Sequence, residues 1–271
     1  MTEINLKKAL KTNTEILYNK KQCIDNLWFL YESVAMHINL NNGSEDRYKY
    51  VFAGSSPWPN FIYNIDADET WLVNKTGLLC DKIREHKLPP FIIAEPGNVI
   101  NDSEEILSDH GFRLVVKWPG MIYRIVPVEI MHNDKLSVTL LDEVTGLKKW
   151  FGIVKETLFQ DKDFTEDFIQ LVSLQHIKWF ILHYNNSPVG TALINIKNNV
   201  AGFYMISVIK EYRNSGFAYY FLSVILNMLE KQGIKHAVLQ ANAASYSLYK
   251  KLGFVDIGNF NIYWKTGVFN K

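Results

Sequence analysis

The stretch that most constrains the fold is an apolar segment followed at once by a polar turn with a glycine and then by a second apolar segment. Phe203 to Val208 is predicted to be a buried strand, and Tyr219 to Leu229 is predicted to be a helix. A short turn around Gly216 must therefore lead from strand to helix. A helix that begins in this way leaves backbone N–H groups without partners at the positive end of its dipole. We therefore expect an anion-binding site within 208–218.

The composition is that of an ordinary folded protein. The 271 residues are enough for one large domain or two small ones, with 48% apolar and 21% charged residues. A net charge of +1 gives no broad basic field and argues against a nucleic-acid partner. No apolar run reaches the ~20 residues that span a bilayer, and residues 1–21 are polar and unlike a signal peptide. Cys23 and Cys80 are expected to be core residues in a reducing compartment. We expect a soluble, cytoplasmic protein with no membrane partner, and the oligomeric state stays open.

Strands and helices are predicted in two successive patterns, separated by a boundary at 126–134. The first half is predicted to contain helices at 3–18, 23–38, 76–87 and 102–110, and strands at 48–53, 61–65, 91–94, 112–116 and 121–126. Turns are predicted at Asn42-Gly43 and at Pro119-Gly120. The second half is predicted to contain helices at 142–159, 165–174, 219–232 and 243–252, and strands at 136–141, 179–184, 189–196, 200–208, 237–240, from 254 onward and at 260–264. A hairpin turn is predicted at Asn185-Asn186-Ser187-Pro188 and a second turn at Asn198-Asn199. The fold class is therefore α/β (α+β), a mixed sheet flanked by helices, with domains at 1–127 and 135–271.

A Gly-Phe pair follows a helix and precedes strands in both halves, as Gly111-Phe112 and as Gly253-Phe254. The order strand, helix, Gly-Phe, strands is thus repeated. We interpret this repeat as a diverged internal duplication. Two unrelated α/β halves are the alternative interpretation.

The turn at 213–218 carries a short motif, and the elements and residues that follow it in the sequence make the motif more specific. Arg213-Asn214-Ser215-Gly216-Phe217-Ala218 presents arginine, two residues, glycine, one residue and alanine. A strand, then Asn242, Tyr249 and Gly253-Phe254 follow it. In this order, residues 136–265 resemble the GNAT superfamily of N-acyltransferases. The resemblance implies the GNAT fold and a tandem-GNAT arrangement whose N-terminal half is degenerate, since that half has no counterpart of the glycine loop.

The resemblance implies acetyl-CoA (coenzyme A) as cofactor. Backbone N–H groups of 214–218 can face diphosphate oxygens, and Gly216 permits their close approach. On the strand that is split in this family, Ile206 and Val208 would pair with the amides of pantetheine. Asn242 would bond the pantetheine arm, or cap the following helix, or do both. The implied cofactor-binding residues are Ile206, Ser207, Val208, Arg213, Asn214, Ser215, Gly216, Phe217, Ala218, Asn242 and Ser245.

The implied catalytic residue is Tyr249, which matches the family tyrosine that protonates the leaving thiolate. A phenol stays protonated at neutral pH and is a suitable donor. A core aromatic role for Tyr249 is the alternative, and Tyr246 is a nearby decoy. Where many relatives carry a general base, 202–208 contains no carboxylate. The remaining candidates for the base are Tyr204, Ser207, His183 or a chain of water molecules. No metal site is expected, because the histidines lack ligand-like spacing.

These features imply an N-acetyltransferase that transfers the acetyl group of acetyl-CoA to a primary amine of an unidentified small molecule or peptide, by direct attack in a ternary complex. The alternative is a non-catalytic CoA-binding or regulatory module, which the missing carboxylate favours. The acceptor cannot be identified from the sequence. The loop Pro57-Trp58-Pro59-Asn60 is expected either near the acceptor cleft or as a purely structural turn.

Overall fold

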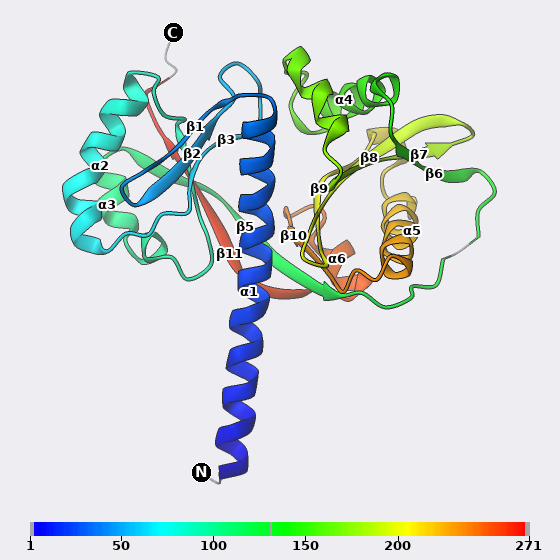
Figure 1. The fold of residues 1–271 in the computed structure, drawn as a ribbon, viewed down its shortest axis with the longest axis horizontal. Helices are drawn as coiled ribbons and strands as arrows, with labels where there is room; N and C mark the ends of the chain where they lie inside the picture. The colour runs from blue at the N-terminus through cyan, green and yellow to red at the C-terminus, as the bar shows by residue number, and fades with distance from the viewer. Residues whose placement is uncertain (1–2, 131, 269–271) are drawn as a thin grey trace.

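The computed structural model describes residues 3–130 and 132–268, and in these ranges the strands join one 11-stranded sheet (Figure 1). Its order is β1-β2-β3-β4-β11-β5-β10-β9-β8-β7-β6, so the last strand of the chain lies between β4 and β5. The sheet therefore runs across the predicted domain boundary. The strands are β1 (Asn41–Glu45), β2 (Tyr48–Phe52), β3 (Asn60–Tyr63), β4 (Phe91–Ala94), β5 (Phe112–Arg124), β6 (Leu136–Leu141), β7 (Ile177–Tyr184), β8 (Ser187–Lys197), β9 (Val200–Val208), β10 (His236–Gln240) and β11 (Val255–Lys265).

The pairing pattern repeats on both sides of the central β11–β5 pair. Next to it, β4 and β10 pair antiparallel with β11 and β5. One step further out, β3 and β9 pair parallel with β4 and β10, and the pairings beyond them are again antiparallel. A helix connects β3 to β4 and another connects β9 to β10, as parallel neighbours require. The two halves of the sheet thus share one plan, related by exchange of β5 and β11.

Helices cover both faces of the sheet (Figure 1). The long helix α1 packs its Cys23, Leu27 and Trp28 onto strands of both halves, and α4 lies beside it. On the other face, α2 and α3 cover the N-terminal half, while α5 and α6 cover the C-terminal half. No helix in 3–130 or 132–268 is long and apolar enough to cross a membrane. The helices are α1 (Glu3–His37), α2 (Glu69–Arg84), η1 (Val99–Asp102), α3 (Glu104–Asp109), α4 (Val144–Leu158), η2 (Glu166–Ser173), η3 (Lys210–Tyr212), α5 (Phe217–Lys231) and α6 (Tyr246–Leu252).

Several predicted breaks are wrong. The helices expected at 3–18 and 23–38 are one helix, because the polar residues between them include neither glycine nor proline. The turn expected at Pro119-Gly120 lies inside β5. Gly120 is needed there because a Cβ would lie 2.8 Å from the Phe260 ring of the neighbouring strand.

The turn expected at Asn42-Gly43 lies inside β1 for the same reason. A Cβ on Gly43 would lie 2.9 Å from the Tyr50 ring on β2, which packs over this position. The helix expected at 165–174 is a 3₁₀ segment, and β11 is one strand with two register shifts where two strands were expected. The hairpin turns expected at Asn185-Asn186 and Asn198-Asn199 are confirmed, with positive φ at all four asparagines.

Candidate active site

The sheet opens between β9 and β10. These strands pair only where 200–202 meets 236–238, and from Phe203 onward β9 pairs with β8 alone. At this point the register of β8 and β9 shifts, and Met205 adopts a left-handed φ of 47°. Thr191 Oγ1 donates to the Met205 carbonyl oxygen at 3.0 Å and holds this bulge in place. One edge of the outer part of β9 is therefore left free for another partner.

The predicted anion loop lies at the end of the same strand. Gly216 is in the left-handed region with φ of 78°, and α5 begins after it without a side-chain cap. In the described part of the chain, the backbone N–H groups of 214–219 find no acceptor. Arg213 Nε donates to the Val208 carbonyl oxygen at 2.8 Å and braces the loop against the strand end. Unpaired donors at the positive end of a helix dipole form an anion site.

A cavity of about 700 Å³ extends from this loop along β9 to α6. All the predicted cofactor-binding residues line it except Ser215. The charged residues among its described lining are Arg213 and Lys251, both positive. Ser207 and Phe217 offer backbone only, because the Ser207 hydroxyl bonds Thr191 at 2.8 Å and the Phe217 ring is buried. Lining residues that the sequence analysis missed are Thr157, Leu158, Tyr212, Tyr219, Ala244, Ser247, Leu248 and Lys251.

Asn242 lies between β10 and α6 and faces this cavity. Its Oδ1 accepts hydrogen bonds from Ser245 N at 2.9 Å and from Ser245 Oγ at 2.8 Å. These bonds close a turn at 242–245, whereas α6 begins later with Ser245 as its N-cap and no side-chain cap bond, so Asn242 stabilises the turn before the helix rather than the helix start. The same bonds leave the Nδ2 group available for a ligand.

Tyr249 is 5% exposed and lines two cavities that meet beside it. Burial raises the pKa of its phenol to about 12, although a hydrogen bond with Ser245 acts in the opposite direction. The hydroxyl therefore keeps its proton at neutral pH. The predicted decoy Tyr246 instead bonds Asp256 Oδ2 at 2.9 Å and lines neither cavity.

The second cavity has a volume of about 440 Å³ and lies between the two halves of the sheet. The loop residues Pro57, Trp58 and Asn60 line it, so the conspicuous loop of the sequence does lie at the cleft. Strands β3, β4 and β5 of the first half and β9 of the second half form other walls. The residues shared by both cavities are Leu158, Ile206, Asn242, Ser245 and Tyr249.

The candidate bases named from the sequence are poorly placed. The Tyr204 hydroxyl donates to Asn26 Oδ1 at 2.9 Å, and burial raises its pKa well above the ordinary value. His183 lines neither cavity, and burial lowers its pKa. Neither cavity has a carboxylate or an imidazole among its described lining residues.

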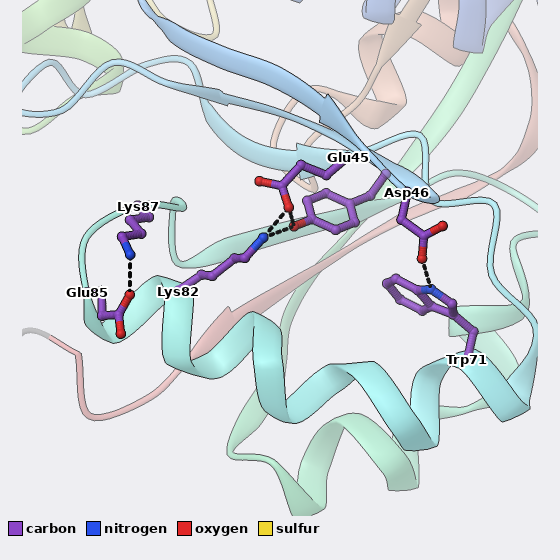
Figure 2. A network of polar contacts seen from close by, with 7 residues as sticks. Glu45, Asp46, Trp71, Lys82, Glu85 and Lys87 are labelled. Carbon is purple, nitrogen blue, oxygen red and sulfur yellow. Dashed lines mark hydrogen bonds and ion pairs between the residues drawn. The ribbon is translucent and has the colours of Figure 1, made fainter.

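The corresponding helix start in the N-terminal half is already filled by a carboxylate of the chain. Before α2, Asp68 Oδ1 accepts from Trp71 N at 2.8 Å. Further contacts tie α2 to the β1–β2 hairpin, as Figure 2 shows for Trp71 with Asp46 and for Lys82 with Glu45. This helix start therefore offers no open place for an anion.

Comparison with known proteins shows which family and fold the chain resembles. Residues 144–254 match the model of the acetyltransferase (GNAT) family. A Bacillus subtilis (strain 168) protein, named as an acetyltransferase on a provisional basis, is 29% identical over 80 residues, which is 30% of this chain and 52% of that protein. The chain thus spans about half of that relative. The uncharacterized protein YyaT of the same organism is 27% identical over 45% of this chain and 82% of its own length.

Solved structures resemble almost the whole chain. A GCN5-related N-acetyltransferase from Kribbella flavida gives a TM-score of 0.66 at 11% identity, over 88% of this chain and 95% of its own. A functionally unknown conserved protein from Staphylococcus epidermidis gives a TM-score of 0.61 at 14% identity, over 85% of this chain and 96% of its own. The predicted mixed α/β GNAT fold is confirmed, and the match to the acetyltransferase (GNAT) family model lies within residues 144–254.

Proposed function

We propose that this chain, whose residues 144–254 match the acetyltransferase (GNAT) family model, transfers an acetyl group from acetyl-CoA to the amino group of an acceptor bound between its two halves. One observation carries the proposal. A cavity that begins at an open N–H loop and a second cavity between the halves meet at the buried hydroxyl-bearing residue Tyr249. A donor and an acceptor would thus reach the same point from different sides.

The residues around the larger cavity fit CoA. The unpaired N–H groups of 214–218 suit diphosphate oxygens, and Arg213 and Lys251 add positive charge for phosphates. The edge of β9 at Ile206 and Val208 has no partner strand and suits the pantetheine amides, which pair as an added strand does, although the Val208 carbonyl oxygen already accepts from Arg213 Nε. When bound, acetyl-CoA supplies an acetyl thioester, so that the N–C bond of the amide forms as the C–S bond breaks.

The chain's own part in the reaction is to position the amine and to move protons. The walls shared by the two cavities bring the amino group beside Tyr249, and this proximity supplies much of the rate. Tyr249 holds a proton that it gives to the departing sulfur, and solvent restores that proton. The amine loses its own proton to water, because no basic side chain is found among the described lining residues.

Two measurements test this function on the purified chain. Calorimetric titration with CoA should show binding, and incubation with acetyl-CoA and an amine panel should release free thiol together with an N-acetylated product identified by mass spectrometry. Tyr249→Phe should retain CoA binding and lose most turnover. Absence of any binding of CoA or acetyl-CoA would refute the proposal.

A non-catalytic CoA-binding or regulatory module is the second candidate, favoured by the lack of a carboxylate or imidazole among the described lining residues. It predicts tight CoA binding with no product from any amine, even at alkaline pH where alkylamines are neutral. Product formation under those conditions would exclude it.

A further inference from the structure

The wall of the smaller cavity is built from aromatic rings. Phe61 stacks on Tyr31 with ring centroids 5.6 Å apart and an interplanar angle of 10°. It also meets Phe91 at 6.2 Å and Trp118 at 6.4 Å. These rings, together with Trp58, come from α1 and the N-terminal half of the sheet. Except for Tyr31 they are only half-buried, so each leaves part of its surface open to the cavity.

The polar residues that this cavity shares with the larger one stand at one end of it, and Gln240, which also lines it, donates from Nε2 to Cys23 Sγ at 3.3 Å. None of its described lining residues is charged. Asn242, Ser245 and Tyr249 belong to the junction with the larger cavity. Asn60 lies at the aromatic end, but its Oδ1 accepts from Ala53 N at 2.9 Å and its Nδ2 donates to Ser56 O at 2.8 Å. The cavity therefore has aromatic rings at one end and the polar residues Asn242, Ser245 and Tyr249 at the end where the acetyl group would be transferred.

Building on the proposed function, we infer that the acceptor is an uncharged arylamine, whose ring lies against Phe61 and Trp118 and whose amino group points to Tyr249. A cavity of about 440 Å³ accommodates a molecule of one to three rings. Offset-stacked and edge-to-face ring pairs give such a ligand both affinity and orientation. The N-terminal half thereby acts as the specificity module for a reaction carried out by the C-terminal half.

The lack of charge selects an arylamine over an alkylamine. An alkylamine is an ammonium ion at neutral pH, and moving it into a cavity without a carboxylate costs free energy. Aromatic faces attract ammonium ions, but this attraction favours the form that has no lone pair for attack. An arylamine delocalises its lone pair into the ring and is protonated only in acid. It enters neutral, and no general base is needed to deprotonate it before attack.

The test compares acceptors on the full chain at neutral pH. We expect p-toluidine and 5-aminoindole to be acetylated with kcat/KM at least ~10-fold above n-hexylamine and spermidine, since burying an unpaired charge is costly. In the presence of CoA, p-toluidine should also bind directly, which tryptophan fluorescence can follow through Trp58 and Trp118. Absence of binding by both arylamines would overturn the inference.

Two pairs of variants locate the site. Trp58→Ala should raise the KM for 5-aminoindole about 10-fold with little change in kcat, whereas Tyr18→Ala, an exposed aromatic on α1 outside both cavities, should change neither. Val115 is 49% exposed and lines the cavity, so it tolerates substitution. Val115→Glu should shift the preference towards n-hexylamine by roughly three- to five-fold relative to its uncharged match Val115→Gln.

The outcomes separate this inference from the proposed function. If neither CoA nor acetyl-CoA binds, the proposed function fails and the inference fails with it. If acetyl-CoA is consumed with n-hexylamine or spermidine in preference to arylamines, the function stands and the arylamine inference is wrong. A preference for octanoyl-CoA over acetyl-CoA that Trp58→Ala abolishes would show that the aromatic end holds an acyl chain, and this result would also overturn the inference.

Discussion

Substitution of Gly216 by alanine gives the sharpest test of the anion loop, because the same helix offers a matched control. Gly216 precedes α5 and Gly233 follows it, and both have a φ of 78°. A Cβ built on either glycine meets nothing within 4 Å. Both are exposed. The two alanine variants therefore introduce the same backbone strain in the same open space, at opposite ends of one helix.

The expected loss of stability is equal and small for both variants. An alanine in the left-handed region costs roughly 1–2 kcal/mol, and the lower entropy of the unfolded chain offsets about 0.5 kcal/mol of this. A net loss of ~1 kcal/mol lowers the melting temperature of a chain this size by a few degrees. Scanning calorimetry of Gly216→Ala and Gly233→Ala without CoA should give matching shifts.

The affinity for CoA should separate the two variants. A methyl group on Gly216 would stand in the middle of the segment whose N–H groups have no acceptor, and we expect it to hinder the close approach of a diphosphate. Loss of one hydrogen bond to a charged oxygen is worth about 2 kcal/mol, or roughly a 30-fold rise in Kd. Gly233→Ala should bind CoA as the unmodified chain does. Equal Kd values for the two variants, measured by titration calorimetry, would refute the assignment of this loop to the diphosphate.

Three further results are expected. Tyr249→Phe should lower kcat about 100-fold without weakening the binding of CoA. In the unmodified chain, the pKa of Tyr249 is raised to about 12, so the phenol loses its proton only as pH rises through that value. The turnover of an arylamine should therefore stay level between about pH 7 and pH 10. Asn242→Asp keeps an acceptor for Ser245 N and should preserve the melting temperature, whereas loss of the Nδ2 donor should weaken CoA binding in titrations. The hydrogen bond from Trp71 N is the main cause that lowers the pKa of Asp68. The Asp68 carboxylate therefore stabilises the fold fully above the ordinary pKa of an aspartate, and this contribution is lost as pH falls. Asp68→Ala should lower the melting temperature more at neutral pH than in acid and leave the affinity for CoA unchanged.

The local features of the glycine loop at 208–218 could be predicted from the sequence because one continuous segment specifies them. Strand, turn and helix at 203–229 follow from apolar periodicity and one glycine. The errors also concern glycine. Gly43 and Gly120 were assigned to turns, but each lies in a strand beneath an aromatic ring of its neighbour. A glycine that makes room for a ring looks in sequence like a glycine that makes a turn, since only the neighbouring strand distinguishes them.

The aromatic cavity could not be predicted, because its walls come from distant parts of the chain. Tyr31, Phe61, Phe91 and Trp118 lie on four different elements, and only the sheet order brings them together. Each alone is indistinguishable from a core aromatic. The one local signal was the Trp58 loop, whose two prolines restrict its backbone, and the structure places that loop at the cavity.

The repeated plan of the sheet gives a physical reason for the division of labour between the halves. We propose that they descend from one duplicated unit, since β3-α2-β4-α3-β5 repeats the order and pairing of β9-α5-β10-α6-β11. In the second unit, the start of α5 is left open with unpaired N–H groups. In the first unit, Asp68 caps the start of α2, so a carboxylate of the chain stands where an anion would bind. The hydrogen bond from Trp71 N to Asp68 stabilises the start of α2 and removes an anion site from the first unit. The surface of the first unit can then form a wall of the cavity that we propose for the acceptor. Because β5 and β11 each cross into the other half of the sheet, that wall is held rigidly against the junction at Tyr249.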